Sequence, residues 1–318
     1  MSRRASLALL VCCGLTLPAL AQDKADLKWT FDPKKPFYQT VNTKTFQTMK
    51  VTDQSVTQNQ DQTFIFKWTP VKVEKDEVVI KQKIVGLKVN IDVGNSKIIF
   101  DSTAKENPVN PLTNFFNKIV GAEFTLTLDT KDGVKITKLE GDKDFVAALA
   151  AVNPNMKPLL EQILGNKALM EMALPTFNSV PGKTVEKGKP EATWKRESTI
   201  DMGPIGKYTT TYTYTYEGKD AGKGAEKIKV IPELKYTQPD DKAGGNLPFK
   251  IKSATLTASD ASGEVYFTGG RVKESTLKMT LKGDLNVEIG QQTTKVDLTQ
   301  NQTTTVTIDE KQPAGVKE

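Results

Sequence analysis

The sequence predicts a mainly β fold: an all-antiparallel, strongly curved sheet or half-barrel meander, with about three amphipathic helices inserted within residues 110–174. Three observations lead to this prediction. Apolar or β-branched residues recur at every second position over many segments, which is the period of a strand. Short turn sequences separate several of these segments, which indicates antiparallel hairpins. One central region has apolar residues at helical spacing instead.

Residues 1–21 have the pattern of a signal peptide. Arg3 and Arg4 form a positively charged start, an apolar stretch follows, and small residues stand at Ala19 and Ala21. This pattern predicts cleavage before Gln22 and an exported protein, either periplasmic or extracellular. Beyond it no stretch approaches the roughly 18 apolar residues of a membrane-spanning helix, so we expect no transmembrane segment in the mature chain.

Strand patterns occupy most of the remaining chain. The clearest covers residues 208–216, where four tyrosines fall on one face and threonines on the other. Alternating aromatics on a half-buried strand are ordinary core residues, so we interpret this tyrosine ladder as core, with a carbohydrate-stacking platform as the alternative. Further runs of this kind are residues 64–68, 71–75, 78–84, 87–93, 124–128 and 277–281. Turn sequences that join such runs stand at residues 94–95, 132–133, 203–206 and 269–270.

Three helices are predicted in the central region. The first follows Asn110, a candidate N-cap, and the second covers residues 144–152. The third has an apolar stripe over residues 156–173 and ends before Pro175. Each helix must lay its apolar face on the sheet or on a neighbouring helix.

The chain is predicted to form two lobes. Residues 22–178 make an N-terminal β lobe that contains the helices, and residues 191–308 make a C-terminal β lobe. Residues 179–190 are rich in turn signals and are the predicted boundary. The polar residues 309–318 are predicted to be a disordered tail.

A short motif occurs twice. Thr-Gln-Asn-Gln stands at residues 57–60 and again at residues 299–302, and both copies lead into strand patterns. A duplicated hairpin unit would explain the repeat. Alternating strands built from few residue types would also match by coincidence, and the sequence leaves both explanations open.

The composition excludes most familiar enzyme mechanisms. The chain has no histidine, and its only cysteines, Cys12 and Cys13, lie in the predicted signal peptide. The mature chain therefore lacks the commonest general base, the commonest transition-metal ligand and the thiolate nucleophile. No metal or cofactor motif is present. Candidate carboxylates such as Glu197 and Asp201 share one strand face, but the general exposure of acidic residues predicts solvated charges there.

The charge pattern excludes a nucleic-acid partner. The formal net charge is +6, and lysines are interspersed with acidic residues along the chain. A nucleic-acid-binding protein would gather its basic residues on one stripe and interleave aromatic ones.

A curved sheet that closes over amphipathic helices can leave an apolar cavity, and flexible apolar side chains suit its lining. The candidate lining residues are Phe115, Phe116, Ile119, Met156, Leu160, Leu164, Met170 and Met172. A filled core would have the same composition. The predicted function is a non-enzymatic exported envelope protein that binds an apolar or lipid-like ligand between the sheet and the helices. The alternatives are a structural module that meets an envelope protein partner through edge strands and, least favoured, a carboxylate-based hydrolase.

Several short segments resemble a known family. The segments are Phe37-Tyr38 with its threonine-rich strands and residues 156–164, 202–206 and 247–251. Together they resemble an uncharacterised family of exported bacterial domains of unknown function, over most of the mature chain. The resemblance implies no activity and no catalytic residues. The layout of a curved sheet with inserted helices is also similar to the periplasmic lipoprotein-carrier fold, which is an analogy of architecture alone.

Overall fold

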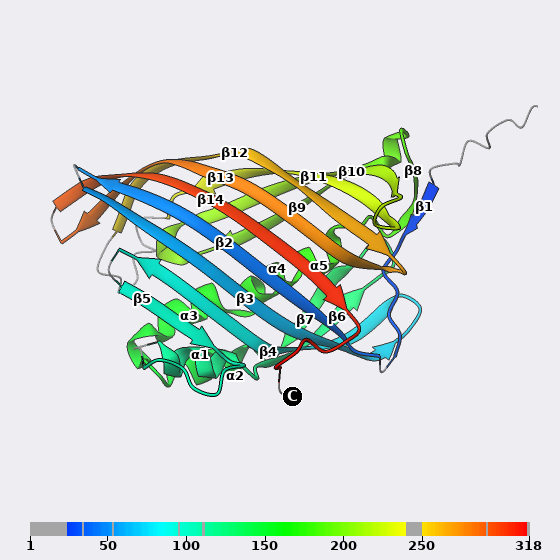
Figure 1. Ribbon diagram of the computed structural model, residues 1–318, viewed down its shortest axis with the longest axis horizontal. Coiled ribbons are helices and arrows are strands. Elements are labelled where there is room, and N and C mark those ends of the chain that lie inside the picture. Colours follow the sequence, from blue (N-terminus) through cyan, green and yellow to red (C-terminus); the bar gives the residue numbers. More distant parts are fainter. Residues whose placement is uncertain are drawn as a thin grey trace, which may run out of the picture.

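The computed structural model describes residues 24–316 except residues 34, 53, 95, 110–111, 240–249 and 291. The predicted signal peptide and the candidate N-cap Asn110 lie outside the described residues. Most of the described chain is strand, and the helices gather in its central segment (Figure 1). The predicted fold class is confirmed.

Twelve strands form one sheet, in which all the strand pairs are antiparallel. The order across the sheet is β7-β6-β4-β3-β2-β14-β13-β12-β11-β10-β9, and β5 pairs with β4. The strands are β2 (Phe37–Val51), β3 (Gln54–Val73), β4 (Glu77–Val93), β5 (Ser96–Asp101), β6 (Glu123–Asp129), β7 (Lys135–Glu140), β9 (Thr193–Asp201), β10 (Lys207–Asp220), β11 (Ala225–Thr237), β12 (Lys250–Thr268), β13 (Arg271–Ile289) and β14 (Gln292–Asp309). A separate pair joins β1 (Lys24–Leu27) to β8 (Lys183–Glu186).

The predicted strand runs are present, but neighbouring runs merge. Residues 78–84 and 87–93 are a single strand, β4. Gly86 lies inside it, against Ile65 of β3, where a Cβ atom would come within 2.9 Å of the Ile65 side chain. The glycine therefore marks close packing between paired strands, and the strand does not end there.

The α-helices of the described residues all lie between β5 and β8 in the chain. They are α1 (Thr113–Ile119), α2 (Asp142–Ala150), α3 (Lys157–Ile163), α4 (Asn166–Ala173) and α5 (Pro175–Asn178). Short 3-10 turns are η1 (Pro154–Met156), η2 (Pro190–Ala192) and η3 (Gly203–Ile205). The third predicted helix, residues 156–173, is divided into α3 and α4, because Gly165 has an extended backbone with ψ 171°.

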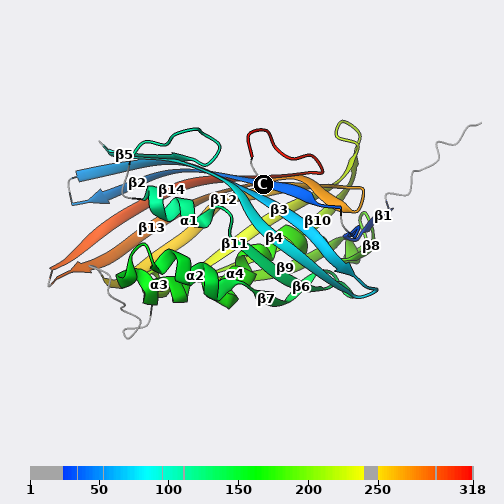
Figure 2. The same cartoon turned by 90° about the horizontal axis from the view of Figure 1, so that it is seen from below.

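The sheet is strongly curved, and the helices lie on its concave side (Figure 2). Helix α4 contacts both edge strands, β7 and β9. On one side the Asn166 Nδ2 atom donates to the Leu139 carbonyl oxygen at 2.7 Å. On the other side a Glu171 carboxylate oxygen accepts hydrogen bonds from the Ser198 hydroxyl at 3.1 Å and the Thr199 N–H at 3.3 Å. A helix therefore bridges the two edges that strand pairing leaves open.

The two predicted lobes share this sheet, because β14 pairs with β2 from Val296↔Val51 to Asp309↔Tyr38. The lobe boundaries themselves stay a prediction. Residues 179–190 contain β8 and the buried side chains of Val180 and Val185, so this segment is part of the packed structure.

The C-terminal segment differs from the expectation of a disordered tail. As far as residue 316 it follows the convex face of the sheet, and Val316 is buried against Tyr38, Ile65 and Val85. The Gln312 side chain donates to the Val316 carbonyl oxygen at 2.7 Å. The burial of Val316 and the hydrogen bonds of Gln312 together hold this segment on the sheet.

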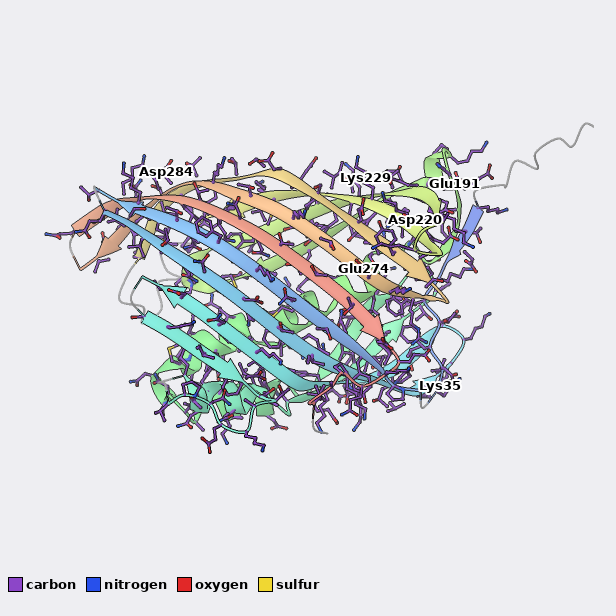
Figure 3. All side chains as sticks on the ribbon, viewed as in Figure 1. Lys35, Glu191, Asp220, Lys229, Glu274 and Asp284 are labelled. Carbon is purple, nitrogen blue, oxygen red and sulfur yellow. The ribbon has the colours of Figure 1, made fainter. Side chains whose placement is uncertain are left out.

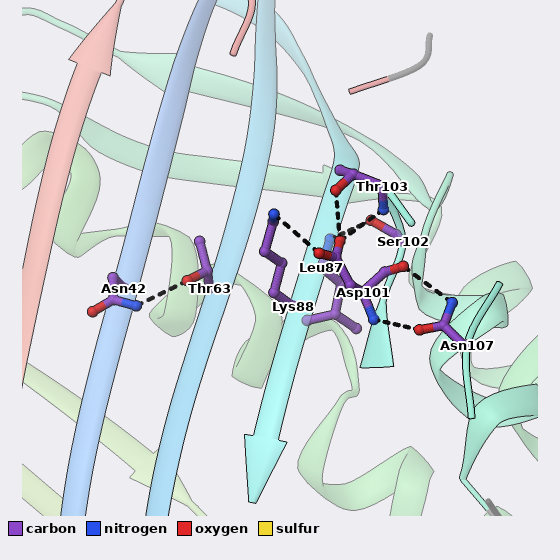
Figure 4. Close-up of polar contacts among 8 residues, drawn as sticks. All are labelled: Asn42, Thr63, Leu87, Lys88, Asp101, Ser102, Thr103 and Asn107. Carbon is purple, nitrogen blue, oxygen red and sulfur yellow. Dashed lines mark hydrogen bonds and ion pairs between the residues drawn. The ribbon is translucent and has the colours of Figure 1, made fainter. Parts of the chain in front are cut away.

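Asp101 organises the turn that leads from β5 towards α1 (Figure 4). Its carboxylate accepts hydrogen bonds from the Thr103 N–H at 2.8 Å and hydroxyl at 2.6 Å, and Lys88 Nζ lies 3.1 Å away. Its own N–H donates to Asn107 Oδ1 at 2.6 Å. Burial raises the pKa of the Asp101 carboxyl, but the hydrogen bonds and the Lys88 charge outweigh burial and hold the pKa below its ordinary value.

Candidate functional site: an apolar cavity under helices α4 and α5

A cavity of about 200 Å³ lies between the concave face of the sheet and the end of α4 with α5. Strands β2 and β10 to β14 line one side, and Met172, Pro175, Thr176 and Ser179 line the other. Most of the strand residues that face it are aliphatic or aromatic. Among the described residues, no charged side chain lines the cavity.

The strand period determines which residues reach the cavity. On β14 the lining residues are Thr304, Val306 and Ile308, and on β2 they are Gln39 and Val41. Successive side chains of a strand point to opposite faces, so these alternate positions share the concave face.

The tyrosine ladder lies on the same concave face. Tyr214 and Tyr216 are buried, which confirms the core interpretation for them. Tyr212 and Tyr214 also line the cavity, and the Tyr214 ring stacks on Trp194 with 5.7 Å between the ring centroids. Part of the ladder therefore serves both as core and as a cavity wall.

Two polar side chains of the lining, those of Gln39 and Ser179, are buried. Gln39 is buried and bonded on both sides: its Oε1 accepts from Trp68 Nε1 at 3.0 Å, and its Nε2 donates to the Thr176 hydroxyl at 3.1 Å. Ser179 is only 6% exposed, and its hydroxyl has no hydrogen-bond partner among the described residues. Leaving a buried polar group unpaired costs about 1–3 kcal/mol, and the Ser179 hydroxyl oxygen is itself covered by the surrounding atoms.

Burial also affects the tyrosines on this face. It raises the pKa of Tyr214, and it raises the pKa of Tyr236 to about 12, with a smaller contribution from Tyr208. The Tyr236 hydroxyl donates to the Ile205 carbonyl oxygen at 2.8 Å. Both phenols are therefore neutral hydrogen-bonding groups at neutral pH.

We expect the unfolding free energy to stay nearly constant between about pH 6 and pH 9 and to fall above about pH 10, because the chain has no histidine to titrate. An unfolded tyrosine loses its proton at about pH 10, whereas Tyr236 keeps it until about pH 12. The stabilisation is therefore complete below about pH 10 and is lost as the pH rises through about 12. Urea unfolding at a series of pH values measures this curve. Tyr236→Phe should make the unfolding free energy fall less steeply above about pH 10. An unchanged fall would contradict the assignment of this pH dependence to Tyr236.

The sequence-predicted lining residues lie in different places. Met172 lines the cavity and is 42% exposed. Phe116 and Leu160 are buried in core clusters. The partly buried residues packed against those clusters are Phe115, Ile119, Met156, Leu164 and Met170. The role of these eight residues in ligand binding stays a prediction.

Sequence reasoning missed the cavity residues that come from the strands. Val306, Val41 and Leu277 lie on three neighbouring strands whose residues are far apart in the sequence. Their alternating pattern places each on an apolar face. Only the strand order shows that these faces meet under α4 and α5.

Other kinds of site have little support. Within the described ranges, no group of three or more histidine, cysteine, aspartate or glutamate side chains could hold a metal ion. Glu197 and Asp201 are exposed on β9, as predicted for solvated charges. None of the helices that the structure describes has the length and apolar character needed to cross a membrane.

Comparison with known proteins gives one family match. The family described as "Family of unknown function (DUF6263)" matches residues 75–235. The matched segment runs from the start of β4 into β11 and includes all the helices described above. No curated protein matches the sequence.

Several solved structures are similar over much of this chain at low identity. A lipovitellin, studied for its lipid–protein interactions, is 12% identical over 90% of this chain and 26% of its own, with a TM-score of 0.43. This chain thus spans about a quarter of that lipovitellin chain. OccK5 (OpdH) of Pseudomonas aeruginosa is 8% identical over 86% of this chain and 98% of its own, with a TM-score of 0.21. The translocator domain of the autotransporter NalP from Neisseria meningitidis is 8% identical over 87% and 89%, with a TM-score of 0.22.

Proposed function

The chain belongs to the family of unknown function DUF6263, in agreement with the resemblance seen in the sequence, and we propose that it is a non-enzymatic exported protein that binds a small apolar ligand. The ligand site is the cavity between the concave sheet and helices α4 and α5. The observation that carries the proposal is the cavity of about 200 Å³, whose lining is mostly apolar. The proposal of export rests on the pattern of residues 1–21.

The volume limits the ligand. An engineered apolar cavity of roughly 150 Å³ binds benzene, whereas pockets for drug-sized molecules measure about 300–1,000 Å³. A volume of about 200 Å³ therefore suits one ring system or a short acyl chain. A diacyl lipid could place only part of its apolar surface there.

The polar side chains of the lining affect how a ligand can bind in the cavity. Sites for small molecules combine apolar walls with a few polar groups that fix the ligand's direction. Gln39 has its bonds to Trp68 and Thr176, so it supports the wall. The Ser179 hydroxyl is unpaired but buried, so a ligand would have to displace atoms of the wall to reach it.

The alternatives have weaker support. A module that binds a partner through its edge strands needs accessible edges, but α4 contacts both β7 and β9. A carboxylate-based hydrolase needs acidic residues at the cavity, and no acidic side chain of the described residues lines it.

Binding of a neutral fluorescent probe with a single ring system, 1-naphthylamine, tests the proposal. We expect saturable binding to the native protein, and at least tenfold weaker binding to Val306→Trp, because the larger side chain fills the cavity. Thr307→Trp is the matched control, since Thr307 is the next residue of β14, is exposed and points to the convex face. The native protein should bind the probe as well as this control does. Absence of saturable binding, or equal binding by both variants, would overturn the proposal.

A further inference from the structure

The concave floor beside the cavity carries a band of uncharged polar side chains on three neighbouring strands. We define this amide band as Thr43, Thr45 and Gln47 of β2, Gln58, Gln60 and Gln62 of β3, and Gln300, Gln302 and Thr304 of β14. Thr45 pairs with Gln60 on one side and with Gln302 on the other. The two copies of Thr-Gln-Asn-Gln therefore flank β2 and present their glutamines on the same face.

Hydrogen bonds run along the amide band. Gln58 Nε2 donates to Gln60 Oε1 at 3.3 Å, and Gln60 Nε2 donates to Gln62 Oε1 at 2.9 Å. On β14, Gln300 Nε2 donates to Gln302 Oε1 at 3.3 Å. A glutamine amide has two N–H donors and two acceptor lone pairs, and these ladder bonds use at most one of each. The half-buried amides keep hydrogen-bonding capacity for another molecule.

Charged side chains are kept off this face. On β2, on β14 and on residues 54–64 of β3, the charged positions have the opposite strand parity and so point to the convex face. They are Lys44, Lys50, Asp61, Lys295, Asp297 and Asp309. The labelled residues Asp284, Lys229 and Glu274 lie on the same outer face (Figure 3).

Because the described residues of this face carry amides and no charged side chains, the cost of removing water from a head group determines which head groups can bind there. An ionised head group placed there would lose water without gaining a counter-charge, which is costly. A neutral hydroxyl or amide group would instead exchange its bonds to water for bonds to the glutamines.

The amide band is continuous with the cavity. Thr304 lines the cavity, and its hydroxyl accepts a hydrogen bond from Gln302 Nε2 at 3.4 Å. A ligand whose apolar part fills the cavity would thus have its polar end on the glutamines. Resting on the proposed function, we infer that the ligand is an uncharged amphiphile whose hydroxyl- or amide-bearing head group binds the amide band while its apolar part occupies the cavity.

Calorimetry with three probes that share one octyl chain tests this inference. The probes are octyl glucoside, octanoate and octyltrimethylammonium, each below its micelle concentration. We expect octyl glucoside to bind the native protein at least tenfold more tightly than either charged probe. Gln302→Leu should weaken octyl glucoside binding at least tenfold and leave the affinity for 1-naphthylamine within twofold. Asn301→Leu is the matched control, because Asn301 is the adjacent, exposed residue on the convex face.

The outcomes separate this inference from the proposed function. If 1-naphthylamine binds the cavity but the three octyl probes bind equally, or if Gln302→Leu behaves like Asn301→Leu, the head-group inference is overturned and the cavity function stands. If the naphthylamine does not bind, the cavity function is overturned. In that case a tenfold loss of octyl glucoside affinity in Gln302→Leu, measured by calorimetry, would still support head-group binding at the amide band. An unchanged affinity would overturn it.

Discussion

Phe177→Ala is expected to lower the unfolding free energy by about 3–5 kcal/mol, the usual cost of truncating a fully buried phenylalanine. Phe177 has no exposed surface and stands in α5. Its ring centroid lies 5.3 Å from that of Trp29 and 5.0 Å from that of Trp68, in edge-to-face arrangements. This single ring joins the N-terminal segment, β3 and the helix that covers the cavity. Its loss leaves a void between three rigid elements that cannot close on one another.

Chemical denaturation with urea, followed by tryptophan fluorescence, measures this effect. Phe46→Ala is the matched control, because Phe46 is 46% exposed on β2 and should lose well under 1 kcal/mol. A loss of stability in Phe177→Ala no larger than that of the control would show that α5 does not anchor the core. All three tryptophans, including Trp194, are buried as packing anchors, so the fluorescence signal reports on the core itself.

Gly182→Ala should destabilise the protein far more than Gly188→Ala, although the two glycines have almost the same φ angle. Their φ angles are +74° and +78°, a region that costs an alanine roughly 1–2 kcal/mol. A Cβ atom on Gly182 would overlap the backbone of Gly133, whereas one on Gly188 would meet nothing within 4 Å. The overlap adds about 1–3 kcal/mol, because the turn between β6 and β7 must move away.

The difference between the two variants isolates the backbone contact. Both proteins should fold, and their urea midpoints give the two free energies under the same conditions. Equal losses of unfolding free energy would mean that the turn before β8 can shift without cost. The Gly133–Gly182 contact would then contribute nothing to the stability. The Gly182 N–H also donates to the Leu27 carbonyl oxygen at 3.1 Å, so a shift there would disturb the β1–β8 pair as well.

Much of the local structure follows from the sequence pattern. The alternation of residues 208–216 predicts one strand with its tyrosines on a common face, and β10 has that face against the core. Gly94 and the turns at residues 132–133, 203–206 and 269–270 lie between consecutive strands, as predicted, and residue 95 is outside the described residues. These features depend on neighbours within a few residues, where strand period and turn chemistry act directly.

The candidate site is only partly predictable. The sequence correctly indicates that strands and helices meet, and Met172 reaches the cavity. Phe116 and Leu160 have the same apolar character but are buried in the core, because a lining residue and a filled core residue obey the same pattern. The strand side of the cavity comes from residues such as Val41 and Val306, whose partnership no local signal reveals.

By itself the sequence determined the fold class, the face on which each strand residue lies and the absence of charge from one face of β2 and β14, because strand period is a local property. Only the tertiary structure decided that β2 lies beside β14, that α4 bridges the edges β7 and β9, and that a cavity remains beneath α4 and α5. Pairing between distant segments depends on closing long loops of chain and on the total volume that side chains fill. Neither quantity is encoded in any single stretch of residues.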